Sequence, residues 1–223
     1  MKNKFYYLLN QLILTDIKRW FLTGTLTVFY VICIGISILY AGNSHATETI
    51  VLLRHAEKPN EGLGQLSCQG LNRALALPEV LLKIFGKPDA IFAPNPSIKK
   101  MDHDVKYPYI RPLATIEPTA IRVGLPVNVE WGFDDIESLK QSLMDSSLKN
   151  ATVFVAWEHH LLDEIAKGLL LNLHASPEIV PTWKSDDFDS IYVITISEDG
   201  SGNRTAVFNI VKEGLNKQSA TCS

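Results

Sequence analysis

The sequence predicts an α/β protein in which helices cover both faces of a mostly parallel central sheet, giving three layers (αβα). Short apolar runs typical of strands alternate with segments whose apolar residues recur at helical spacing. The runs Ile50–Leu53 and Ala151–Trp157 contain no charged residue, which indicates strands buried on both faces. Two strand patterns near the end of the chain are joined by Asp199–Gly202, and this hairpin signal predicts an antiparallel edge.

The other elements follow from local signals. After the first strand, the patterns predict a helix that begins at the capping residue Ser67 and ends at Gly86. Further helices are predicted at Arg111–Val123, Ile136–Met144 and His160–Leu173, and Lys99–Tyr109 is predicted to be polar and irregular. Further strands are predicted at Asp89–Ala93, Pro126–Trp131, Asp189–Ser197 and Thr205–Val211. Pro78 leaves two interpretations open, because it either kinks the first helix or begins a second one.

Length and charge indicate one domain, residues 47–223, behind an amino-terminal appendage, residues 1–46. The whole chain has 223 residues and a net charge of −3. Without the appendage, 17 basic and 23 acidic residues remain in 177, a net charge of −6. Such an acidic body is not attracted to phosphate backbones, so nucleic acid is excluded as an expected partner.

The appendage predicts a membrane segment. No Asp, Glu, Lys or Arg occurs from Trp20 to Thr47, and the apolar span of about residues 20–42 suffices to cross a bilayer, which takes about 20 residues. Basic residues precede the span, so we expect the body to lie outside the cytoplasm, on the periplasmic side. Two interpretations remain open: an uncleaved anchor, or a long signal peptide cut after the small residues of Ser44–Ala46.

Two cysteines of the body raise the question of a disulfide. Cys68 lies near the start of the body and Cys222 at its end. An oxidising compartment would allow them to pair. The sequence does not show whether their Cα atoms come close enough, so both a disulfide and two free thiols remain open.

Three stretches carry the residues with chemistry. Arg54 and His55 directly follow the first strand, Arg111 opens a helix, and Glu158 and His159 follow a later strand. The carboxyl ends of parallel strands meet at one edge of a sheet, so we expect the first and last groups to face one crevice. A positive pocket in an acidic body fits a dianionic phosphoryl group, which guanidinium forks bind and a neutral imidazole can attack.

These stretches resemble the histidine phosphatase superfamily, the phosphoglycerate-mutase-like fold. The resemblance rests on Leu53–Pro59 after the first strand, on Arg111 with Thr115, and on Trp157–His159 after the late strand. It implies that His55 is the nucleophile and forms phosphohistidine. It further implies that Arg54, Arg111 and His159 hold the phosphoryl oxygens, that water hydrolyses the phosphoenzyme, and that neither a metal nor a cofactor is required.

The proton donor to the leaving group is the open part of this resemblance. The candidates are Glu158, which we favour, Glu57, and an acid within Asp102–Asp104. Glu57 has two interpretations, a substrate contact or a salt bridge that orients Arg54. Lys58 likewise either reaches the phosphate or faces solvent. His160, which follows His159, is expected on the helix as a solvated or capping residue.

The sequence therefore predicts an exported or membrane-anchored phosphomonoesterase. Its substrate would be a phosphorylated small molecule or glycan, and a mutase fits less well outside the cytoplasm. One alternative is a phosphate-binding module of the same fold that does not turn over. Another is a metal site formed by Glu158, His159, His160 and His103. The two adjacent histidines are expected to point apart if both are helical, which disfavours that alternative.

Overall fold

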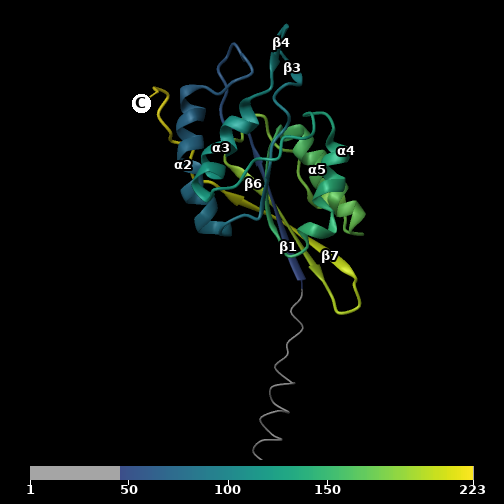
Figure 1. The fold of residues 1–223 in the computed structure, drawn as a ribbon. Helices are drawn as coiled ribbons and strands as arrows, with labels where there is room; N and C mark the ends of the chain where they lie inside the picture. Colours follow the sequence, from purple (N-terminus) through teal and green to yellow (C-terminus); the bar gives the residue numbers. More distant parts are fainter. Residues whose placement is uncertain (1–45, 223) are drawn as a thin grey trace, which may run out of the picture. The chain divides into compact units, whose positions relative to one another are not determined.

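The computed structural model describes residues 46–222. Within this range, a five-stranded sheet has the strand order β2-β5-β1-β6-β7, and a separate two-stranded hairpin is formed by β3 and β4 (Figure 1). No helix in residues 46–222 is long and apolar enough to span a bilayer. The membrane segment predicted at about residues 20–42 lies outside the described residues.

The sheet is centred on β1 (Ala46–Arg54). β1 pairs in parallel with β5 (Thr152–Trp157), and β5 pairs in parallel with β2 (Ala90–Phe92). On its other side β1 pairs antiparallel with β6 (Ser190–Glu198), which continues into β7 (Arg204–Lys212).

The sheet is mixed: four of its five strands run in one direction, as expected of a mostly parallel sheet, and β6 runs opposite to them. The antiparallel part includes β6, which lies beside the central strand as well as next to the edge. The reason is the connection before β6. Carbonyl groups of Ser185 and Asp187 accept hydrogen bonds from Arg54, at the carboxyl end of β1. The chain therefore enters β6 from that end and must run opposite to β1.

Helices cover both faces of the sheet, as predicted. α2 (Cys68–Phe85) and α3 (Arg111–Val123) pack on one face, and α4 (Ile136–Leu143) and α5 (His159–Asn172) pack on the other (Figure 1). Successive residues of β1 alternate between the two cores, because side chains of a strand point to opposite faces. Two short 3₁₀ helices, Ser146–Leu148 and Pro177–Ile179, complete the described elements.

Local predictions succeed where one signal acts alone. Ser67 caps α2 by accepting a hydrogen bond from the Gly70 N–H, and the helix ends before Gly86. Pro78 lies inside α2 without starting a second helix. The strand predicted at Pro126–Trp131 is wrong, because this stretch forms only a single bridge, between Asn128 and Phe92.

The stretch Lys99–Tyr109 was predicted to be irregular, and this prediction is wrong. It folds into the hairpin of β3 (Lys99–Asp102) and β4 (Val105–Pro108). Its polar residues hide the strand signal, since the hairpin packs no face on the main core. Figure 1 shows it at the top, at the end of the domain where β1 finishes.

A disulfide links Cys68 to Cys222, which settles the question left open by the sequence. The two Cα atoms are 4.8 Å apart. The Asn72 amide one turn further along α2 donates hydrogen bonds to the carbonyls of Ser219 and Thr221. The end of the chain is therefore fastened to the first turns of α2.

Candidate active site

The predicted residues meet at the carboxyl ends of β1 and β5. Arg54 is in register with Trp157, and the His55 N–H donates to the Trp157 carbonyl over 3.0 Å. This pairing places His55 beside Glu158, as the parallel-strand argument predicted. Five predicted site residues are buried: Arg54, His55, Arg111, Glu158 and His159.

His55 is held as a neutral imidazole with one free nitrogen. Its Nδ1 lies 2.8 Å from the Ala56 carbonyl oxygen. A carbonyl can only accept, so Nδ1 carries the proton and Nε2 keeps its lone pair. Burial, together with the charges of Arg111 and Arg54, lowers the pKa of His55 well below its ordinary value. The ring is therefore a base and nucleophile at neutral pH rather than a cation.

The loop that carries His55 is fixed to α3. The Ala56 N–H donates to Thr115 Oγ1 over 2.9 Å, and that hydroxyl donates to the Arg111 carbonyl over 2.8 Å. Thr115, quoted as part of the second motif, thus ties the backbone after His55 to the first turn of α3. The Thr115 hydroxyl therefore positions both the loop that carries His55 and the first turn of α3, which carries Arg111.

Arg54 is positioned by a segment that the sequence analysis missed. Its Nη1 donates to the carbonyls of Ser185 and Asp187, over 2.8 and 3.1 Å, and its guanidinium lies 3.8 Å from the centroid of the Phe188 ring. Burial lowers the pKa of Arg54 to about 10, so the group remains cationic at neutral pH. No local pattern in this polar segment pointed to such a role.

Arg111 and Lys58 share one carboxylate. Arg111 Nη1 donates to one oxygen of Asp102, and Lys58 Nζ lies 2.8 Å from the other. Burial raises the pKa of Asp102, but these two cations outweigh it and lower the pKa to about 2. Asp102 is therefore ionised and does not fit the role of proton donor that the sequence left open for Asp102–Asp104. The proposed phosphate contact of Lys58 stays a prediction.

Glu57 does not orient Arg54, so that interpretation was wrong. Its carboxylate accepts hydrogen bonds from Arg73, over 2.9 Å from Nε and 2.7 Å from Nη2. Gly70 allows this approach, because a Cβ at that position would lie 2.2 Å from the Glu57 carbonyl oxygen. α2 can therefore pack directly against the loop and present Arg73, which is also bound by Glu213. A substrate contact of Glu57 is left as a prediction.

Glu158 is the capping residue of α5. It accepts a hydrogen bond from the Leu161 N–H, lies 2.7 Å from His159 Nδ1, and lies 3.9 Å from Lys100 Nζ. Burial raises the pKa of Glu158, but the contact with His159 and the charge of Lys100 outweigh it and lower the pKa to about 2. An ionised carboxylate has no proton to give, so the donor role that we favoured for Glu158 does not fit its surroundings.

His159 is the first residue of α5 and is 7% exposed. Its Nδ1 is within ion-pair distance of Glu158, although the angle is too poor for a hydrogen bond, and Nε2 has no partner in the described part of the chain. A buried ring nitrogen left without a partner has donor or acceptor capacity to spare. This is consistent with the predicted contact to a phosphoryl oxygen.

The rings of His159 and His160 lie against each other at a tilt, which corrects the expectation that they point apart. Their centroids are 3.9 Å apart and their planes differ by 35°. Ligand atoms of these two rings and of Glu158 lie within 4.8 Å of one another. The ammonium group of Lys100, 3.9 Å from a Glu158 oxygen, repels a cation at this position. His103, the fourth proposed ligand, contacts the Asn60 carbonyl instead. The arrangement fits an anion better than a metal.

Lys100 is a further cation of the site that the sequence did not suggest. Its Nζ lies 5.1 Å from the centroid of the Tyr109 ring and 4.7 Å from that of Phe133. The Tyr109 ring in turn lies edge-on to His55, with centroids 6.1 Å apart. The only available signal was the alternation of side chains along β3, and the sequence analysis did not predict this strand.

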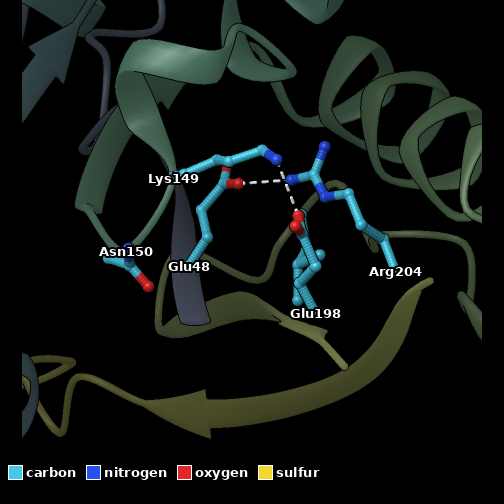
Figure 2. Close-up of a pocket in the computed structure, with 6 residues that line it drawn as sticks. Glu48, Lys149, Asn150, Glu198 and Arg204 are labelled. Atoms are coloured by element: carbon cyan, nitrogen blue, oxygen red, sulfur yellow. Dashed lines mark hydrogen bonds and ion pairs between the residues drawn. The ribbon is translucent and has the colours of Figure 1, made fainter. Parts of the chain in front are cut away.

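A second charged cluster, drawn in Figure 2, includes Glu48 near the start of β1. Glu48 pairs with Arg204 and Lys149 pairs with Glu198. Glu48 precedes His55 by seven positions on an extended strand, a span of about 23 Å. The cavity there is about 10 Å³, room for a water molecule at most, and the charges that line it compensate one another. We assign it no chemistry.

Comparisons with known proteins found no matching family model and no matching curated protein. Among solved structures, the chain is similar to a protein described as phosphohistidine phosphatase SixA from Nakamurella multipartitia. The identity is 14% over 73% of this chain and 95% of that one, and the TM-score is 0.47. A phosphoserine phosphatase mutant from Entamoeba histolytica has 13% identity, coverages of 75% and 98%, and a TM-score of 0.46.

A mycobacterial glucosyl-3-phosphoglycerate phosphatase has 18% identity, coverages of 73% and 95%, and a TM-score of 0.45. Identities and TM-scores this low carry no argument about function. The functional assignment therefore rests on the geometry of the site in this chain.

Proposed function

We propose that this protein is a phosphomonoesterase that acts through a phosphohistidine intermediate on His55. One observation carries the proposal: a buried, neutral imidazole has its Nδ1 fixed to a carbonyl oxygen and its Nε2 free, between two buried arginines. Neutral nucleophiles attack phosphorus most readily where fixed positive charge offsets the charge of the phosphoryl oxygens.

The surrounding side chains supply that charge. Arg54 and Arg111 bind the phosphoryl oxygens, and the free nitrogen of His159 binds another. Arg111 Nε and Arg54 Nε are buried and have no partner among residues 46–222, so each guanidinium has donors left for an anion. Water then attacks phosphorus and returns His55 to its starting form.

Its location is the second part of the proposal. The protein is exported or anchored on the outer side of a membrane through its first 46 residues, and it acts there on a phosphorylated small molecule or glycan. The Cys68–Cys222 disulfide supports this location, since such bonds persist mainly in oxidising compartments.

A phosphate-binding module without turnover is the second candidate. It is favoured by the state of Asp102 and Glu158, which are both held ionised by neighbouring cations. A site whose carboxyl groups cannot donate a proton could bind a phosphate ester and leave it intact.

Hydrolysis of p-nitrophenyl phosphate tests the proposal. The full chain, purified in a mild detergent, is assayed beside His55→Ala, each with and without a chelator. We expect chelator-resistant hydrolysis that falls by at least about 10³-fold in His55→Ala, the scale of losing a covalent nucleophile. Phosphate that raises the melting temperature of a wild type with no esterase activity would point instead to the binding module.

A further inference from the structure

We propose that Lys100 donates the proton to the leaving-group oxygen, a role that neither Asp102 nor Glu158 can fill. The inference rests on the proposed function and names the missing acid of that reaction. It adds a residue outside the three motifs that the sequence analysis recognised.

The strand β3 aims Lys100 into the site. Side chains of a strand alternate between two sides, so Lys100 shares a side with Asp102, while Lys99 takes the other. Asp102 is buried against Arg111 and Lys58, which identifies its side as the one that faces the site. The Lys100 side chain is 25% exposed, whereas Lys99 is exposed to solvent.

The contacts of Lys100 leave its ammonium group free to act. Nζ is 3.9 Å from a Glu158 oxygen, too far for a hydrogen bond, and faces the rings of Tyr109 and Phe133. Aromatic faces attract a cation without taking its protons. The ammonium is thus held next to Glu158 and to Tyr109, whose ring neighbours His55, with N–H groups available to a bound ester.

Charged groups from every neighbouring element act on this lysine. Glu158 at the start of α5 and Asp102 on β3 favour the ammonium form, while Arg111 on α3 and Lys58 after β1 oppose it. Burial is the largest influence, and the pKa of Lys100 is lowered from its ordinary value. A lysine with a lowered pKa is a stronger acid than one in water, which suits proton transfer near neutral pH.

The step balances as follows. His55 Nε2 forms the N–P bond as the bond from phosphorus to the ester oxygen breaks. One Lys100 N–H proton passes to that oxygen, which leaves as the alcohol, and Lys100 becomes a neutral amine. In the second step water attacks phosphorus, the N–P bond breaks, and the amine accepts the proton that the water loses.

The test compares two esters whose leaving groups need a proton to different degrees. p-Nitrophenolate leaves without protonation, whereas the alkoxide of glycerol 3-phosphate does not. The full chain is assayed as wild type, Lys100→Met, Lys100→Arg and Lys99→Met. Lys100→Arg keeps the positive charge but gives up its proton far less readily.

We expect both Lys100 variants to lower kcat on glycerol 3-phosphate by about 10²–10⁴-fold, the usual scale of general acid catalysis. On p-nitrophenyl phosphate their kcat should change by less than about tenfold, and Lys99→Met should match the wild type on both esters. Melting temperatures close to that of the wild type would confirm that the variants are folded.

Three results would overturn the inference while leaving the proposed function in place. The first is an equal loss of kcat on both esters, which would indicate that Lys100 binds phosphate. The second is full activity of Lys100→Arg, which would indicate that only the positive charge matters. The third is a wild type that hydrolyses only the aryl ester. A wild type that hydrolyses neither ester would overturn the inference together with the proposed function.

Discussion

Two buried arginines, Arg73 and Arg54, lie close to the same loop yet differ in how their charge is met. Arg73 is bound by the carboxylates of Glu57 and Glu213, and by the side-chain oxygen of Asn216. Burial lowers the pKa of Arg73, but these carboxylates outweigh it and raise the pKa above its ordinary value. Its charge is fully neutralised inside the protein.

No carboxylate in residues 46–222 forms an ion pair with Arg54, although Glu158, Asp187 and Glu57 act on its charge from further away. The described hydrogen bonds of its Nη1 go to backbone carbonyls, its plane lies over Phe188, and its Nε has no partner within residues 46–222. A buried guanidinium whose donors all have partners belongs to the structure, and one that keeps a donor without a partner is suited to bind an anion from outside. Within residues 46–222 Arg73 is of the first kind and Arg54 is of the second.

The largest expected effect is on stability, from Arg73→Met. The change leaves the half-buried Glu57 and the buried Glu213 without their cation, so we expect a loss of about 3–5 kcal/mol in the free energy of unfolding. Urea unfolding followed by circular dichroism measures it. A loss under about 1 kcal/mol would show that the comparison misjudges Arg73.

Arg54→Lys should act mainly on catalysis. Lysine keeps the charge but loses the fork that binds two phosphoryl oxygens, so kcat/KM on p-nitrophenyl phosphate should fall by about 10²–10³-fold. Arg122→Lys, a change at an exposed arginine near the end of α3, is the matched control and should match the wild type. Unchanged kcat/KM in Arg54→Lys would remove Arg54 from the site.

The disulfide should contribute to stability without affecting kcat. Removing the Cys68–Cys222 link by Cys222→Ser frees a long loop in the unfolded chain, and we expect a loss of about 2–5 kcal/mol. Thermal unfolding with and without reductant checks this, since reductant should lower the melting temperature of the wild type only. A fall in kcat at a temperature where the variant is fully folded would contradict this division of roles.

The pH dependence should be the smallest effect. The pKa of His55 is lower in the folded protein than in the unfolded chain, so the unfolded chain binds more protons as pH falls below about 6.5. Between pH 6.5 and 5 the contribution of His55 to stability should therefore fall, whereas Glu48 and Glu213, whose pKa burial raises to about 7, contribute in the opposite direction. Because both glutamates are present in the two proteins, the wild type should lose stability relative to His55→Asn as the pH falls from 6.5 toward 5. A constant difference between the two proteins would show that His55 is not buried in its neutral form.

The sequence located those site residues that directly follow a predicted strand. His55 and Glu158 could be placed together because β1 and β5 are parallel neighbours and end at the same edge. Helix boundaries were equally accessible, since Ser67 and Gly86 act through local hydrogen bonds and backbone conformation.

Interactions between distant segments were not accessible in this way. The partner of Glu57 is Arg73, sixteen positions later, and the carbonyls that position Arg54 come from a segment about 130 positions away. Neither pairing leaves a periodic trace in the sequence. The direction of β6 and the position of Lys100 depend on the same kind of long-range packing, which explains why both were missed.

The most direct test of the central claim is to trap the phosphoenzyme. The full chain is mixed with ³²P-labelled p-nitrophenyl phosphate, quenched in alkali within milliseconds and digested for mass spectrometry. The account predicts a label that is stable to alkali, labile to acid and located on His55, and that is absent from His55→Ala. Rapid hydrolysis with no labelled protein at any time, or a label on another residue, would contradict it.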